Sequence, residues 1–164
     1  MELAIRNKWI SLGGSSVVKD LNENDVLKVK GKVFTFSNKK FVYDLEDNLL
    51  YTVRNKVFTI FARKAFVLDK DGNTLVKIRR KIFSVHDRYF VESSLGEMEI
   101  CGNIFGFDYK ITLNGQEIGH ISRKISLRDS FVLTINDDFD YALFVALVIA
   151  IDNITDKRRS DSSN

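Results

Sequence analysis

The chain has 164 residues, of which 45% are hydrophobic and 29% are charged, and its 25 basic and 22 acidic residues leave a net charge of +3. This is the composition of one globular domain with a sizeable core, and the small net charge gives no basis for a nucleic-acid partner. Cys101 is the single cysteine, so an internal disulfide is excluded and a reducing, cytoplasmic location is expected. Charges interrupt the apolar residues of the first nine positions, which argues against a signal peptide there.

The chain up to residue 135 carries strand patterns and no amphipathic stretch that would predict a helix. Residues 2–10 alternate loosely, residues 11–16 form a glycine- and serine-rich loop, and residues 17–24 are a polar connection. A stronger strand pattern begins at residues 25–34, where valine and phenylalanine favour a pleated sheet. A last strand is predicted at residues 130–135.

A repeat organises the middle of the chain. Residues 41–60 align without gaps to residues 66–85, residues 109–125 form a third copy, and residues 89–107 form a weaker one. Each copy reads as a strand, a tight turn and a further strand, with turn signals at Glu46-Asp-Asn48, Asp71-Gly72 and Asn114-Gly115. Short strands at this spacing predict an all-β barrel or sandwich.

Basic clusters mark the points where the alternation within a repeat changes phase. Val76 and Ile78 share one face of a strand, whereas Phe83 and Val85 have the opposite parity. The change falls on residues 79–81, and in the preceding copy on residues 54–56. Because a strand changes face only through a bulge, corner or turn, both clusters are predicted to be exposed strand corners.

The longest apolar run, Tyr141–Ile151, predicts a helix that must be enclosed on every side. Eleven helical residues span about 16 Å, roughly half of a bilayer core, so no transmembrane segment is expected. Residues 136–138 are the predicted N-cap, and residues 152–153 and 156–159 are predicted to return the chain to water. We therefore expect a helix at about 138–152 inside a sheet and a polar tail at 156–164.

The order of these features is similar to that of the LURP-one-related family, which shares its fold with the Tubby C-terminal domain and the phospholipid scramblases. The resemblance covers roughly residues 1–155 and is carried by the motifs at 66–73 and 76–83 and by the run at 141–151. It implies a single domain at residues 1–155, mainly β, in which a closed antiparallel barrel of about 12 strands encloses the C-terminal helix. Tubby domains bind phosphoinositides through basic residues on the barrel, but no single-residue match places that lipid site in this chain.

The basic residues at the strand corners are the candidate ligand-binding residues. Alternate residues of a strand share a face about 6–7 Å apart, as Lys28, Lys30 and Lys32 do. The corners together predict a patch for an anionic headgroup or phosphate, formed by Arg54, Lys56, Lys77, Arg79, Arg80, Lys81, Arg123 and Lys124. The alternative interpretation is a solvated barrel face whose lysines discourage edge association.

No pattern in the chain predicts catalysis, a metal site or a cofactor. His86 and His120 are the two histidines and, with one cysteine, give neither zinc spacing nor a positioned base, while Cys101 alternates as a core residue would. The Asp69–Thr74 turn resembles part of a calcium loop but lacks the bidentate glutamate that should follow the glycine, so a hairpin turn is predicted.

The sequence thus predicts a non-enzymatic binding module whose basic exterior recognises anionic membrane lipid headgroups. We expect such a protein in the cytoplasm, associated peripherally with a membrane surface. The alternative is a cytosolic scaffold or regulatory protein that acts through protein–protein contacts.

Overall fold

The computed structural model describes residues 1–6, 15–31, 39–56, 64–80, 87–103, 108–124 and 130–161. Side chains are described for these residues except Arg6, Lys56, Asp87, Arg123, Lys124 and residues 155–161. The strands are β1 (Glu2–Arg6), β2 (Ser15–Asp20), β3 (Asp25–Gly31), β4 (Lys40–Tyr43), β5 (Leu49–Lys56), β6 (Lys64–Leu68), β7 (Thr74–Arg80), β8 (Asp87–Ser93), β9 (Gly96–Asn103), β10 (Asp108–Leu113), β11 (Gln116–Lys124) and β12 (Ser130–Ile135). One helix, α1 (Tyr141–Asp161), follows.

The strands form a closed antiparallel barrel in which each strand pairs with its neighbours in the chain. The pairing of β1 with β12, from Glu2 opposite Thr134 to Arg6 opposite Ser130, closes the ring. Closure removes the sheet edges on which other chains could add strands. The barrel is therefore confirmed, and the sandwich is excluded.

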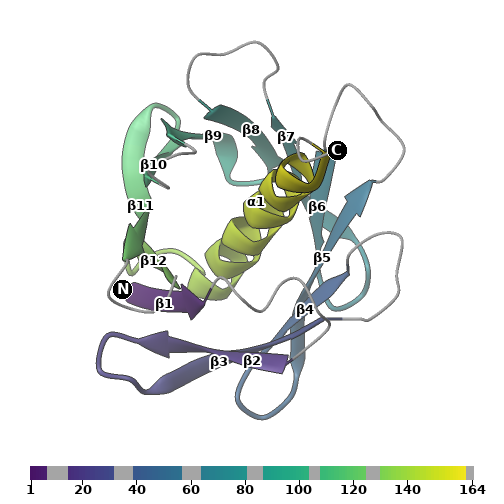
Figure 1. The fold of residues 1–164 in the computed structure, drawn as a ribbon, viewed down its shortest axis with the longest axis vertical. Helices are drawn as coiled ribbons and strands as arrows, with labels where there is room; N and C mark the ends of the chain where they lie inside the picture. The colour runs from purple at the N-terminus through teal and green to yellow at the C-terminus, as the bar shows by residue number, and fades with distance from the viewer. Residues whose placement is uncertain are drawn as a thin grey trace.

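Helix α1 runs through the middle of this barrel and begins beside the N-terminus (Figure 1). Its residues from Ala142 to Ile154 are buried on all faces, and Phe144 and Leu147 are 0% exposed. The helix packs mainly on β5 and β6, and also on β12 and β4. The enclosed apolar helix predicted from the run at 141–151 is confirmed.

The residue that caps α1 differs from the prediction. Asp140, and not the run at 136–138, accepts hydrogen bonds through Oδ1 from the backbone N–H groups of Ala142 (2.9 Å) and Leu143 (3.2 Å). Its second carboxylate oxygen accepts a hydrogen bond from the Tyr51 hydroxyl on β5. Of the acidic residues at 137–140, Asp140 is the one that Tyr51 of the barrel wall holds in position, and α1 begins directly after it.

The predicted return to water after Ile151 is wrong. Asp152 is 4% exposed and Asn153 is 1% exposed, and the helical backbone continues to Asp161. The reason is geometric: an eight-residue strand such as β5 spans about 26 Å, whereas the eleven apolar helical residues span only about 16 Å. The wall therefore still surrounds the helix when its apolar run has ended.

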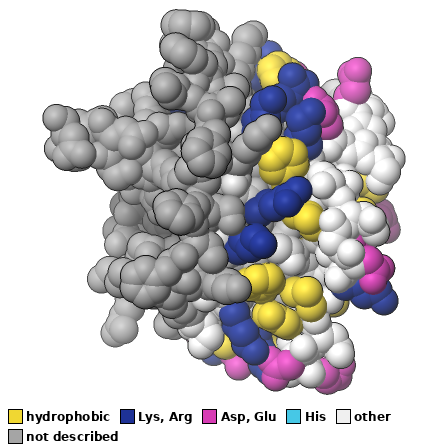
Figure 2. All heavy atoms as spheres, turned by 90° about the vertical axis from the view of Figure 1, so that its right-hand side faces the viewer, with side chains coloured by type: hydrophobic (Ala, Val, Ile, Leu, Met, Phe, Trp, Pro, Cys, Tyr) yellow, Lys and Arg dark blue, Asp and Glu magenta, His cyan; other side chains and the backbone are white. Residues whose placement is uncertain are grey.

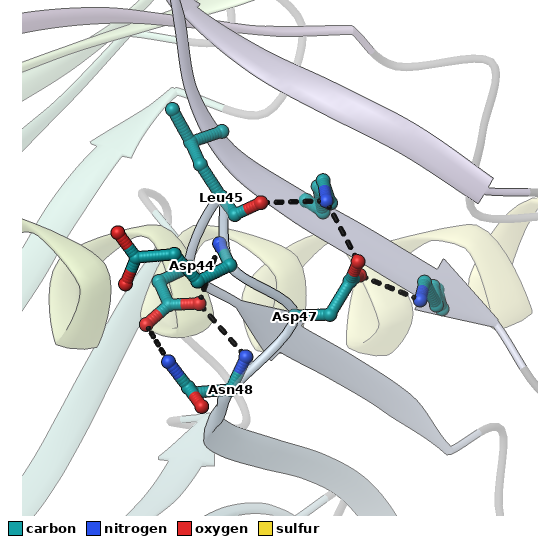
Figure 3. A network of polar contacts seen from close by, with 7 residues as sticks. Asp44, Leu45, Asp47 and Asn48 are labelled. Carbon is teal, nitrogen blue, oxygen red and sulfur yellow. Dashed lines mark hydrogen bonds and ion pairs between the residues drawn. The ribbon is translucent and has the colours of Figure 1, made fainter.

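Three hairpin turns repeat one structure, which begins with an aspartate and ends with an asparagine four residues later. In the turn of Asp44, its Oδ1 accepts the backbone N–H groups of Glu46 (3.0 Å) and Asn48 (2.8 Å), and its Oδ2 accepts the Asn48 side-chain N–H (2.7 Å) (Figure 3). Asp20 and Asp69 make the same three bonds. The asparagine side chain is the main cause of the lowered pKa of each of these aspartates. The hairpin prediction at Asp69 is thus confirmed, because its carboxylate is engaged by the turn itself.

The up-and-down connections divide the barrel into two ends. The β2–β3, β4–β5, β6–β7, β8–β9 and β10–β11 turns lie at one end, together with Met1 and the β12–α1 connection. We call this the turn end and define it by residues 1–2, 19–25, 44–48, 69–75, 93–97, 113–117 and 136–140. Strands β5, β7 and β11 finish at the opposite end, where β6 begins.

Candidate functional site: a basic wall on strands β5 to β7

The predicted basic residues gather toward one end of the barrel but not around one point. Lys56, Arg80 and Lys124 are the last residues of β5, β7 and β11, so all three lie at the end opposite the turns. Strands β5, β6 and β7 are neighbours, whereas β8, β9 and β10 separate β7 from β11. Arg123 and Lys124 therefore stand apart from the other candidates, and Lys81 lies outside the described residues.

Strand register places three basic residues in a row across β5, β6 and β7. Lys56 is opposite Lys64, and Lys64 is in turn opposite Arg79. No local sequence pattern places Lys64 in this row, because its position beside Arg79 depends on the register between strands. Like charges directly opposite one another destabilise a sheet, so this row has an electrostatic cost within the protein.

A second row lies one step toward the turn end. Arg54 is opposite Phe66, Phe66 is opposite Lys77, and Lys77 is opposite Glu92 on β8. The Arg54 guanidinium lies 5.5 Å from the centre of the Phe66 ring, a cation–π arrangement. The Lys77 ammonium lies 2.9 Å from Glu92.

The Glu92 carboxylate contacts one cation in each of the two rows. Glu92 contacts both Lys77 and Arg79, and its pKa is lowered chiefly by the hydrogen bond from Lys77. Among the described side chains, Arg54 and Lys64 have no carboxylate partner. We call the surface formed by Arg54, Lys64, Lys77 and Arg79 the basic wall; with Glu92 it carries a net charge of +3.

Figure 2 shows the side of the molecule on which strands β5 and β6 lie. Lysine, arginine and hydrophobic side chains form a band down the middle of the view, and acidic side chains lie mainly at its right and lower edges. Phe66 within the wall and Phe90, opposite Arg79, are half-buried. The wall therefore offers cationic groups beside partly exposed aromatic rings.

Comparison with known proteins decides which family this barrel represents. The LURP-one-related family model matches residues 1–152. The chain belongs to the LURP-one-related family. The X-ray structure of a protein from Arabidopsis thaliana is similar in fold, with a TM-score of 0.67 and 19% sequence identity over 94% of this chain and 90% of that one. No curated protein is significantly similar in sequence.

Two positions within the predicted basic corners, Arg80 and Asn55, are not exposed in this LURP-one-related barrel. Arg80 has the parity of Val76 and Ile78, whose side chains are buried in the core, and it is itself half-buried. It therefore belongs to the interior of the barrel end and not to the basic wall. Asn55, within the other predicted corner, is 7% exposed for the same reason.

The predicted stripe on β3 is largely neutralised. Lys28 and Lys30 lie 2.9 Å and 3.0 Å from the two carboxylate oxygens of Asp47, and Lys28 also donates to the Leu45 carbonyl oxygen at 2.7 Å (Figure 3). These contacts lower the pKa of Asp47, and the Lys30 ammonium lies 4.7 Å from the centre of the Tyr43 ring. Lys32, the third residue of the stripe, lies outside the described residues.

The other candidate residues of the described part of the chain are His120, Cys101 and the acidic side chains. Its histidine, cysteine and acidic side chains form no group of three or more that could hold a metal ion. His120 Nε2 lies 2.9 Å from Asp108, and His86 lies outside the described residues. Cys101 is half-exposed on the outer face, since Ile100 takes the inward position, so the core location expected for the cysteine is wrong. No described helix is both long enough and apolar enough to cross a membrane.

Proposed function

We propose that this LURP-one-related protein is a non-enzymatic binding module whose basic wall recognises anionic membrane lipid headgroups. The observation that supports the proposal most strongly is the row in which register sets Lys64 beside Arg79 and Lys56. Arg79 has a carboxylate partner in Glu92, whereas Lys64 has none among the described side chains, so an external anion would relieve the repulsion between these two cations.

The position of the wall suits a membrane surface. The helix fills the barrel, so the exterior is the surface available for recognition. Each lysine or arginine near an anionic membrane contributes about 1 kcal/mol, so the four cations of the wall would contribute about 4 kcal/mol before losses. The half-buried Phe66 and Phe90 rings would add apolar contact at the headgroup level. In this proposal the protein is cytoplasmic and binds the membrane reversibly.

Flotation with phosphatidylserine-containing vesicles tests the proposal. The protein should float with them at about 0.05 M salt and much less at about 0.5 M salt, because screening shortens the reach of exposed charges. The double variant Lys64→Gln, Arg79→Gln should lose about 2 kcal/mol of binding, or about thirtyfold in partitioning.

A matched variant distinguishes an effect of the basic wall from an effect of the overall charge of the protein. Lys19→Gln, Lys110→Gln removes the same charge from β2 and β10, where each lysine already has an acidic partner. This control should bind vesicles within about threefold of the wild type. Absence of flotation of the wild type at low salt, or equal losses in the two double variants, would contradict the proposal.

The second candidate function is a scaffold that acts through protein contacts. The exposed leucines of the turn end favour it, because they lie in neighbouring hairpin turns that one partner could contact together. A protein that binds partners but not anionic vesicles would support this function over lipid recognition.

A further inference from the structure

The turn end carries all five of the large hydrophobic side chains that are exposed in the described part of the chain. Leu21, Leu45 and Leu95 are 46%, 46% and 42% exposed in three different hairpin turns. Leu75, at the start of β7, is 37% exposed, and Met1, beside the start of α1, is 42% exposed. Successive turns lie two strands apart, about 10 Å, so these side chains are spaced around the ring of turns. One flat partner could therefore contact several of them together.

The same end holds most of the negative charge of the protein. Fourteen of the 22 acidic residues lie in the turn-end segments, against two of the 25 lysines and arginines, Lys19 and Lys70. The remaining 8 acidic and 23 basic residues lie elsewhere in the chain. The turn end is thus strongly acidic, since 14 acidic and 2 basic residues give it a net charge of −12, although the net charge of the chain is +3.

Several turn-end carboxylates lack a described cationic partner. Among the described side chains, Glu46, Asp71, Glu97 and Asp138 have no cationic partner. The basic wall has unpaired cations to match, since Arg54 and Lys64 have no carboxylate partner among the described side chains. The wall also presents half-buried aromatic rings that leucine side chains can contact.

We propose that the turn end docks on the basic wall of a second copy of this chain, in a head-to-tail association. The turn-end carboxylates would pair with Lys64 and Arg54, and Leu45 and Leu75 would contact Phe66 and Phe90. Because the two surfaces differ and lie on one molecule, the contact is heterologous and extends into rings or short chains of barrels. Hairpin turns form a small interface, so the association is weak and favoured at high protein concentration. The inference goes beyond lipid binding and does not rest on it.

Sedimentation velocity of the full chain tests the association. The weight-average sedimentation coefficient should rise with concentration at about 0.05 M salt and stay monomeric at about 0.5 M salt. A monomer at every concentration in low salt would overturn the proposal. An association that salt does not weaken would overturn it as well, because the proposed contact is mainly electrostatic.

Zero-length carbodiimide crosslinking locates the contact. The reagent joins carboxylates to lysine amines, and a mixture of unlabelled and nitrogen-15-labelled protein distinguishes links between molecules from links within one. Links between molecules should join Glu46 or Asp71 to Lys64 or Lys77. Links between molecules that consistently omit either surface would overturn the proposed geometry.

Substitutions should change the strength of self-association in opposite directions, depending on whether they remove a proposed contact or an opposing charge. Leu45→Ser, Leu75→Ser and, separately, Lys64→Gln, Arg79→Gln should each weaken association about tenfold. Lys70→Gln removes an opposing charge at the turn end and should strengthen it. An effect of the same sign in all three variants would contradict the charge argument.

Discussion

Replacing Asn153 with leucine should stabilise the protein, although asparagine is the native residue. The side chain is 1% exposed, and among the described residues neither its Nδ2 nor its Oδ1 has a hydrogen-bond partner. Leaving a buried donor or acceptor unpaired costs about 1–3 kcal/mol, whereas replacement by an apolar group of similar shape removes that cost. An imperfect fit of leucine would cost up to about 1.5 kcal/mol. Because Asn153 leaves both a donor and an acceptor unpaired, at about 1 kcal/mol or more each, we expect the free energy of unfolding of Asn153→Leu to exceed that of the wild type by at least about 0.5 kcal/mol after the cost of an imperfect fit.

Urea denaturation followed by circular dichroism measures this difference. The midpoint should rise while the dependence on urea stays unchanged, since the surface exposed on unfolding is nearly the same. Asn48→Leu is the matched control, because Asn48 donates a hydrogen bond to Asp44 at 2.7 Å, and this substitution should destabilise the protein. If Asn153→Leu lowered the midpoint instead, Asn153 would have a polar partner inside the barrel, such as a bound water, and the reasoning would be refuted.

Three further substitutions test the core, the closure and the helix cap. Leu147→Ala should cost about 3–5 kcal/mol in urea denaturation, since Leu147 is 0% exposed within the buried part of α1. A cost below about 1 kcal/mol would show that the helix is not enclosed. Gly102→Ala should cost at least about 2 kcal/mol in the same assay, because a Cβ there would lie 1.9 Å from the Asp108 carbonyl oxygen, and an unchanged midpoint would contradict that close approach. Burial and the hydrogen bond to Asp140 raise the pKa of Tyr51 in the folded state. Above about pH 10 the unfolded state therefore loses the Tyr51 proton before the folded state does, and the free energy of unfolding of the wild type falls as the pH rises. Tyr51→Phe should lose less stability than the wild type over this pH range. Parallel pH profiles of the wild type and Tyr51→Phe would argue against that raised pKa.

Much of the fold follows from local sequence. The apolar run at 141–151 has no polar face, so it requires an enclosing wall, and the confirmed turn at Asp69 depends only on residues within its own five positions. The turn at Asp20 has the same ends and has Glu23 at its positive-φ position, but the sequence pattern predicts only a polar connection at residues 17–24. The aspartate and asparagine four residues apart would have been the better signal.

Local sequence patterns are enough to predict the repeated hairpins, the buried helix and the basic character of the strand ends, because each depends on residues close together in the chain. Which cations lie side by side depends instead on contacts between distant segments. Lys64 lies beside Arg79 through strand register, Glu92 neutralises Arg79 from the next strand, and Arg80 turns inward by parity. Burial of Asn153 likewise depends on how far the barrel wall extends past the apolar run. Register and wall length are set by pairing between distant segments, and no local pattern contains them.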